Sequence, residues 1–162
     1  MKFEKFVKLA GIRGTVLTSE KFGKFLQCGM VMVRIPEGTN VVAAFARKMP
    51  EWYEEILNDV EDDCAYKAEL TGAELPKPDS SPAQILRIFT DSCGGQVAID
   101  NKTFAIIEKS DKVFICPDTY ADGNGESAAA LVICYGFGDD AEIAGIVFSE
   151  NYFRKMNEKE NA

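Results

Sequence analysis

The sequence predicts an α+β fold in which mainly antiparallel sheet packs against about four short helices, in a single domain over residues 1–162. Its 162 residues suffice for one packed core, and apolar residues make up 46% and charged residues 27% of the chain. Segments of helical periodicity alternate with short runs rich in Val, Ile and Phe. This composition is that of a folded protein and not of a disordered one.

In the first half of the chain, KFEKFVKLAG (residues 2–11) has the periodicity of an amphipathic helix that ends at Gly11. GTVLT (14–18) and KFLQCGMVMVRIP (24–36) are predicted to be strands joined by a turn at SEKFG. VVAAFARK (41–48) fits either a strand or a helix. Pro50 begins a second, acidic helix in PEWYEEILNDV (50–60), and CAYKAEL (64–70) alternates as a half-exposed strand does.

In the second half, ELPKPDSSP (74–82) is the best candidate for an internal boundary. SPAQILRIF (81–89) is predicted to be a helix, because Ser81 can cap it, Pro82 suits its first turn and Gln84 completes a capping box. Strands are then predicted in QVAID (96–100), TFAIIEK (103–109) and KVFICP (112–117), with turns at 100–102 and 109–111. AALVICYGF (129–137) and EIAGIVFS (142–149) form a hairpin, and ENYFRKMNEK (150–159) a last helix.

Two segments share an order of predicted elements. Residues 3–37 and 85–118 both run from an apolar helix through glycine, a short strand, a turn and a long strand to proline and an acidic residue. Four identities occur at an offset of 81 residues: Gly14 with Gly95, Val16 with Val97, Lys21 with Lys102, and Pro36 with Pro117. One interpretation is a pseudo-repeat with similar halves over about 1–75 and 81–162; the other is independent occurrence of the same order.

The absence of histidine removes most familiar hydrolase mechanisms, since no Cys-His or Ser-His-Asp relay can form. Cysteines are widely spaced without a CxxC pair, which predicts reduced, buried thiols: Cys28, Cys64, Cys93, Cys116 and Cys134. DSCGG (91–95) resembles a nucleophile loop, but no base or cation flanks Cys93. We therefore interpret DSCGG as a helix end, with Cys93 under the last turn and Gly94 or Gly95 in the left-handed conformation.

Other polar motifs also lack the pattern that chemistry requires. DTYADGNGES (118–127) carries oxygen ligands, but counting from Asp118 or Asp122 puts Ala129 or Ile133 where a calcium loop needs glutamate. The acids of residues 51–63 suit a solvated helix face, and GFG (136–138) is too short for a phosphate loop. We predict no catalytic residue, no cofactor and no metal site.

Net charge is −8, yet residues 1–34 carry seven Lys or Arg against two Glu, a local charge of +5. This basic segment supplies the candidate contacts for nucleic acid or a partner: Lys2, Lys5, Lys8, Arg13, Lys21 and Lys24. Its contrast with the acidic second helix suits nucleic-acid contact on one face or head-to-tail self-association. No 18-residue apolar run or signal peptide is evident, so we expect a cytoplasmic protein without membrane contact.

MKFEKFVKLAGIRGTV, ILRIF, GGQVAIDNKTFAIIEKSD and IAGIVFSENYF together resemble small, uncharacterised proteins encoded in phages and prophages of Gram-positive bacteria. That resemblance implies a phage-related setting and supplies no catalytic motif. SPAQILRIF with QVAID and TFAIIEKSD, and GIVFSENYFRKM, more weakly resemble DNA sliding clamps. The clamp resemblance implies repeated βαβββ halves whose helices line a basic channel. Three features depart from the clamp pattern: the second predicted helix is acidic, Arg87 is the only basic residue of the third, and the chain is short for a clamp subunit.

These observations predict a non-enzymatic binding or assembly protein that acts through protein–protein contacts or self-association in a phage-related context. Two alternatives stay open at this point. One is a clamp-like, DNA-associated processivity factor, and the other is a small enzyme that depends on carboxylates.

Overall fold

The computed structural model describes residues 1–63, 67–77, 84–120, 127–135 and 142–150. In these ranges the protein has an α+β fold made mostly of strands, with a seven-stranded mixed sheet, a three-stranded antiparallel sheet and three α-helices. The elements follow in this order: α1 (Phe3–Ala10), the 3-10 turn η1 (Gly11–Arg13), β1 (Thr15–Ser19), β2 (Gly23–Cys28), β3 (Val31–Arg34), β4 (Phe45–Lys48), α2 (Glu51–Asp63), β5 (Glu69–Pro76), β6 (Ile85–Thr90), β7 (Gln96–Asp100), α3 (Asn101–Phe104), β8 (Lys112–Tyr120), β9 (Ser127–Tyr135) and β10 (Glu142–Phe148).

The large sheet has the strand order β4-β1-β2-β3-β10-β9-β8, in which β4 pairs parallel with β1 and the other neighbours are antiparallel. The predicted strand at 24–36 is in fact two strands, β2 and β3, joined by a tight turn. Gly29 has a φ of +58° in this turn, a conformation that glycine adopts without the Cβ penalty. The predicted turn before β2 is confirmed, and Gly23 there has a φ of +83°.

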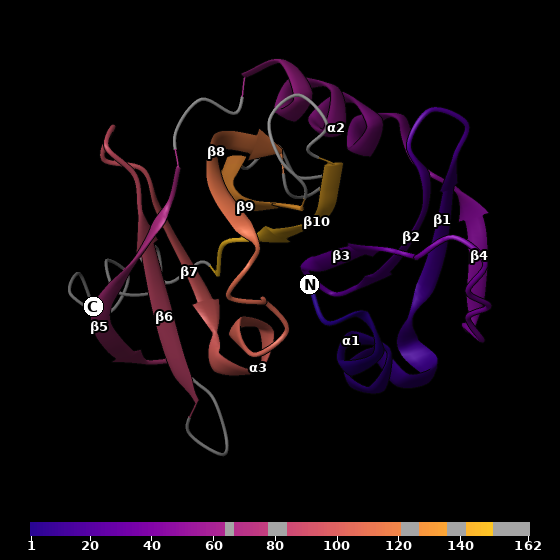
Figure 1. Ribbon diagram of the computed structural model, residues 1–162, viewed down its shortest axis with the longest axis horizontal. Helices are drawn as coiled ribbons and strands as arrows, with labels where there is room; N and C mark the ends of the chain where they lie inside the picture. Colours follow the sequence, from indigo (N-terminus) through magenta and orange to yellow (C-terminus); the bar gives the residue numbers. More distant parts are fainter. Residues whose placement is uncertain (64–66, 78–83, 121–126, 136–141, 151–162) are drawn as a thin grey trace, which may run out of the picture.

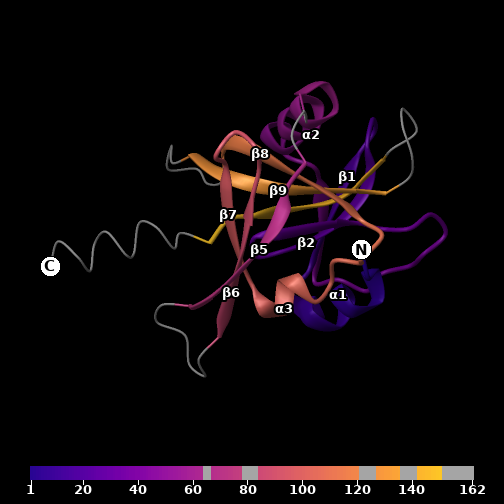
Figure 2. The ribbon, with the colours of Figure 1, turned by 60° about the vertical axis from the view of Figure 1, so that its left-hand side comes forward.

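Both faces of the large sheet are covered along most of its strands, although the edge strand β4 is exposed. On one face α2 packs Tyr53, Ile56 and Leu57 against a cluster that includes Leu17 and Phe25. On the other face lie α1, the segment after α3 and the small sheet. Figures 1 and 2 show α2 on one side of the strands and α1 and α3 next to each other on the opposite side. Burial from both sides explains why strands such as β9 are continuously apolar.

The small sheet has the order β5-β6-β7 and contains the main error of the sequence prediction. Residues 85–89, predicted to be helical, belong to strand β6. Leu86 and Ile88 are buried in a cluster on one face of this strand, while Phe89 is buried in the main core on the other. Pairing with β5 and β7 on both edges satisfies the backbone and overrides the local helix signals. Ser81 and Pro82 lie outside the described residues.

The offset of 81 residues therefore aligns helix α1 with strand β6 and does not match like with like. A different correspondence is present: α1 precedes the antiparallel meander β1-β2-β3, and α3 precedes the antiparallel meander β8-β9-β10. The two meanders meet where β3 pairs antiparallel with β10, with Val33 opposite Gly145. The division into halves over 1–75 and 81–162 stays a prediction.

Residues 101–104 form the short helix α3 where a turn and the strand 103–109 were predicted. The Asp100 side chain caps it by accepting a 2.7 Å hydrogen bond from the Thr103 N–H, and Ile106 then enters the core. The helix prediction at 2–11 is confirmed by α1, and Gly11 ends it with a φ of +53°. The predicted helix at 150–159 lies outside the described residues except at Glu150, as do the loop residues 121–126 and the segment GFG.

Candidate binding surface beside α1

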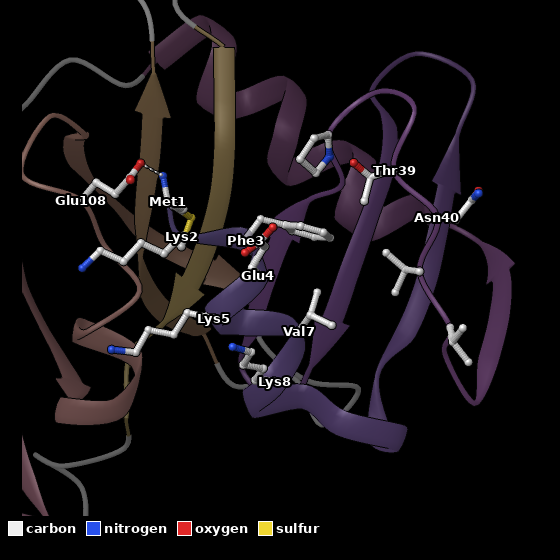
Figure 3. A pocket seen from close by; sticks show the side chains of 13 residues that line it. Met1, Lys2, Phe3, Glu4, Lys5, Val7, Lys8, Thr39, Asn40 and Glu108 are labelled. Atoms are coloured by element: carbon white, nitrogen blue, oxygen red, sulfur yellow. Dashed lines mark hydrogen bonds and ion pairs between the residues drawn. The ribbon is translucent and has the colours of Figure 1, made fainter.

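An open groove of about 1140 Å³ lies between α1 and residues 36–42, the segment that follows β3. We call it the α1 groove. Its apolar lining comes from both sides: Phe3 and Val7 on the helix, and Val41 and Val42 on the facing segment. In Figure 3, Phe3 and Val7 point toward the side that carries Thr39 and Asn40, while Lys2 and Lys5 extend to the opposite side of the helix. The groove thus has an apolar wall and a basic border.

The amphipathic sequence of α1 sets this arrangement. Phe6 is 3% exposed and packs with Ala10 on the core, so the neighbouring positions Phe3 and Val7 are left half-buried at the helix margin. Lys2, Lys5 and Lys8 recur at every third position and remain exposed. A hydrogen bond of 2.7 Å from the Lys2 N–H to the Ile106 carbonyl oxygen ties the start of the helix to the segment after α3.

One end of the α1 groove is held by a partly buried ion pair. The α-ammonium nitrogen of Met1 lies 2.9 Å from the Asp111 carboxylate and 3.2 Å from that of Glu108. The side chains of Met1 and Asp111 are 1% and 2% exposed and their contact is partly buried, whereas the Glu108 side chain is 46% exposed. The pair with Asp111 is shorter and less exposed than the pair with Glu108, and it therefore carries most of the attachment. It fixes the position of α1 relative to the loop between α3 and β8.

Two lysines of the basic border have no hydrogen-bond or ion-pair partner among the described residues. The Lys2 Nζ donates a hydrogen bond of 3.3 Å to the Ala105 carbonyl oxygen. Lys5 and Lys8 make no hydrogen bond or ion pair with any described residue. Glu4 also lines the groove and is exposed. Two unpaired ammonium groups therefore border an apolar surface.

Further cations lie on the same side of the molecule. Arg13 and Lys102 line a small cavity of about 230 Å³ between α1 and α3. Both side chains are exposed. The basic N-terminal segment predicted Arg13 and the lysines of α1 as contacts, but it did not predict Lys102, which the fold brings here from almost a hundred residues away. No local pattern in the sequence marks that residue.

Two of the six predicted contact residues lie elsewhere. The Lys21 ammonium donates a hydrogen bond to the Asn58 side chain of α2, and it lies 4.7 Å from the centre of the Phe22 ring. Because α2 covers the opposite face of the sheet, Lys21 does not join the α1 lysines. Lys24 lines a separate cavity of about 540 Å³ with Arg34, although Thr39 and Asn40 are common to this cavity and the α1 groove.

Helix α2 places negative charge on the side of the protein opposite the α1 lysines. Glu51 and Glu55 are exposed on it, and Glu54 accepts a 2.6 Å hydrogen bond from the Ser19 hydroxyl. The sequence predicted a contrast in charge between these two helices. Because α1 and α2 cover opposite faces of the large sheet, the basic and acidic groups lie on opposite sides of it.

DSCGG forms the turn between β6 and β7, so the predicted helix end and the burial of Cys93 are both wrong. The Asp91 carboxylate accepts hydrogen bonds of 2.9 Å from the Cys93 N–H and 2.8 Å from the Gly95 N–H. The left-handed glycine is confirmed at Gly94, which has a φ of +83°. Cys93 is exposed at the tip of a hairpin, and this surface turn offers no enclosing site for a nucleophile.

The other described cysteines are Cys28 and Cys116, which are half-buried, and Cys134, which is buried. Burial raises the pKa of the Cys134 thiol above its ordinary value of 9.0; Lys112 lowers this pKa by a smaller amount, and Asp111 raises it slightly further. The prediction of buried thiols is thus confirmed for Cys134 and wrong for Cys93, while Cys28 and Cys116 are buried only in part. Cys64 lies outside the described residues. Within the described ranges, no group of three or more His, Cys, Asp or Glu side chains is placed to hold a metal ion.

Comparison with protein-family models, with curated protein sequences and with solved structures found no significant match to this chain. Among the described helices, none is long and apolar enough to cross a membrane.

Proposed function

We propose that this protein is a non-enzymatic binding or assembly protein that contacts a protein partner through the α1 groove. The setting is the phage-related, cytoplasmic one expected from the sequence. The observation that carries the proposal is the exposed apolar wall of the groove beside unpaired lysines. Val42 in this wall is 95% exposed, and Phe45, which follows in strand β4 and does not line the groove, is 69% exposed. Large apolar side chains grouped at an open groove are typical of surfaces that become buried in a complex.

Site-specific photo-crosslinking tests this proposal in host cells. A photoreactive phenylalanine analogue replaces Val42, and in a matched control it replaces Glu55 on the exposed side of α2. We expect a discrete cross-linked protein from position 42 that position 55 does not give. Equal cross-linking at both positions, or none at position 42, would count against the groove as the contact surface.

A second candidate function is a clamp-like association with DNA, and a specific observation favours it. Two units of helix followed by antiparallel meander, α1-β1-β2-β3 and α3-β8-β9-β10, join through β3 and β10 with both helices on one side. We infer that these units are the pseudo-repeat, in place of the one proposed at the offset of 81. Cations gather on that side: Lys2, Lys5, Lys8, Arg13 and Lys102.

Duplex DNA binding measured by fluorescence anisotropy at several salt concentrations tests this second candidate. The logarithm of the binding constant should fall with the logarithm of salt concentration, with a slope of about −0.9 for each phosphate contacted. Lys5→Gln with Lys8→Gln should reduce that slope, whereas Lys67→Gln, at an exposed position on the segment that precedes β5, should not. Light scattering should also reveal a ring-forming oligomer. A strict monomer that binds no DNA at low salt would exclude this function.

The third alternative, a small carboxylate-dependent enzyme, gains no supporting observation from the described residues. The neighbouring carboxylates Glu108 and Asp111 both contact the Met1 ammonium group, which occupies them in a structural role.

A further inference from the structure

The α1 groove combines two features that select different parts of a ligand. Its wall is apolar, through Phe3, Val7, Val41 and Val42, and its border carries Lys2, Lys5 and Lys8. We propose that its occupant is a short acidic segment of a partner protein that presents apolar anchor side chains to the wall and carboxylates to the lysines. This inference rests on the proposed protein-binding function and names the chemistry of the partner.

Apolar side chains line the α1 groove from both sides, where a ligand can reach them. Val42 is 95% exposed on the segment that faces α1, and Phe3 and Val7 are half-buried on the opposite side of the same groove. A side chain inserted between them would contact apolar groups from both walls. Short peptides commonly bind grooves in this way, with a few anchor residues spaced along one face.

The lysines that border the groove complement a negatively charged ligand. Lys5 and Lys8 have no partner among the described residues, and the Lys2 ammonium group contacts only a carbonyl oxygen in the described chain. Of the two carboxylates that line the groove, Glu108 is paired with the Met1 ammonium group and Glu4 is exposed. The border is therefore net positive, on a protein of net charge −8, and attracts carboxylates from the ligand.

Other occupants fit less well. The phosphate backbone of DNA offers nothing apolar to Val7 and Val42. A second copy of this chain could offer the acidic helix α2, but that helix buries Tyr53, Ile56 and Leu57 against its own sheet. It would therefore bring carboxylates without anchors. A partner segment supplies both groups at once.

A fluorescein-labelled peptide of about ten residues, with Leu and Phe at helical spacing among Asp and Glu, is the probe. Two matched peptides replace either its acids by Lys or its apolar residues by Ser. We expect saturable binding of the first peptide to the full chain, and at least about tenfold weaker binding of the other two, a change of roughly 1.4 kcal/mol or more. The variants Lys5→Gln with Lys8→Gln, and Val42→Ser, should weaken binding of the first peptide to a similar degree.

Lys67→Gln is the control, since Lys67 is exposed and does not line the groove, and it should bind the acidic peptide normally. Circular dichroism checks that each variant is folded. Equal binding of the basic peptide, unchanged binding by the lysine variant, displacement of the acidic peptide by duplex DNA, or no saturable binding at all would overturn the inference.

The photo-crosslinking experiment tests the acidic nature of the partner separately from the protein-binding function on which it rests. A partner trapped at position 42 whose cross-linked segment is basic or uncharged overturns the acidic partner and leaves the protein-binding function standing. A trapped segment that contains clustered Asp and Glu with apolar residues supports both. The absence of any partner at position 42 contradicts the function itself.

Discussion

Gly145 of β10 lies directly against the backbone of Met32 in β3. A Cβ atom at position 145 would be 2.6 Å from the Met32 carbonyl oxygen, and 2.5 Å from the sulfur atom of Met1. The irregularity in the pairing of β10 with β9 falls at the same place, between Ile143 and Gly145. Glycine therefore allows the two meanders and the start of the chain to meet at one point beside the α1 groove.

Gly145→Ala should destabilise the protein by about 1–3 kcal/mol, because the added methyl group forces the strands or Met1 to move in a packed interior. Urea unfolding followed by circular dichroism measures the change. Gly72→Ala is the control, since a Cβ there would meet nothing within 4 Å, and its effect should stay below about 0.5 kcal/mol. Equal midpoints for wild type and Gly145→Ala would show that the contact relaxes at no cost.

Asp111→Asn should destabilise the protein by about 1–3 kcal/mol, because it leaves a partly buried ammonium group without its main countercharge. Asparagine keeps an oxygen that can accept the 2.8 Å hydrogen bond from the Glu108 N–H, so the substitution removes mainly the charge. Glu108→Gln affects a carboxylate that is 46% exposed and should cost less than about 1 kcal/mol. Urea unfolding of both variants compares them, and similar losses would show that the two carboxylates share the ion pair equally.

The elements that sequence reasoning placed correctly are those specified by local pattern. Helix α1 follows from its periodicity and Gly11, and α2 follows from Pro50 and the first acidic turn. Strand β6 was missed because its capping signals were local, whereas the pairing with β5 and β7 that decides its conformation is not. Helix α3 was missed for the converse reason. Its four residues are fixed by one cap at Asp100 inside a segment that is otherwise apolar enough for a strand.

The candidate surface was predictable to the same extent. The stripe of Lys2, Lys5 and Lys8 is visible in ten residues of sequence, and its exposure is confirmed. The apolar wall is not visible in that way, because Val42 reaches α1 only through the course of the chain after β3. Lys21, close to the stripe in sequence, lies in the turn between β1 and β2, where its ammonium group contacts Asn58 of α2. Nearness in sequence therefore predicted the charge of the surface but not its shape.

Cys93→Ser should leave partner binding and stability unchanged, because the side chain is exposed at a hairpin tip that the Asp91 carboxylate and Gly94 hold together. In the native protein a thiol reagent such as dithionitrobenzoate should modify Cys93 faster than Cys134, which is buried. Loss of the fastest phase in Cys93→Ser identifies the residue. Loss of binding in a folded Cys93→Ser variant would instead give this thiol the functional role that its surroundings argue against.

The buried thiol of Cys134 should make the protein less stable in alkali. Burial raises the pKa of this thiol in the folded state above the ordinary value of 9.0, so its contribution to stability is fully present below about pH 9. As the pH rises further, the unfolded chain loses the proton first, and stability falls until the folded pKa is passed. Urea unfolding of wild type between about pH 8 and pH 10 should show this decline.

Cys134→Ala should be less stable than wild type at pH 8, because it removes buried apolar volume, and this difference should shrink as the pH approaches 10. Cys93→Ser, which changes an exposed thiol, should keep the steeper decline of wild type. Burial also raises the pKa of Tyr53 above its ordinary value of 10.0, so Tyr53 further lowers stability at higher pH. Wild type and Cys134→Ala should therefore be compared below pH 10. Parallel pH curves for wild type and Cys134→Ala would assign the alkaline loss to other groups.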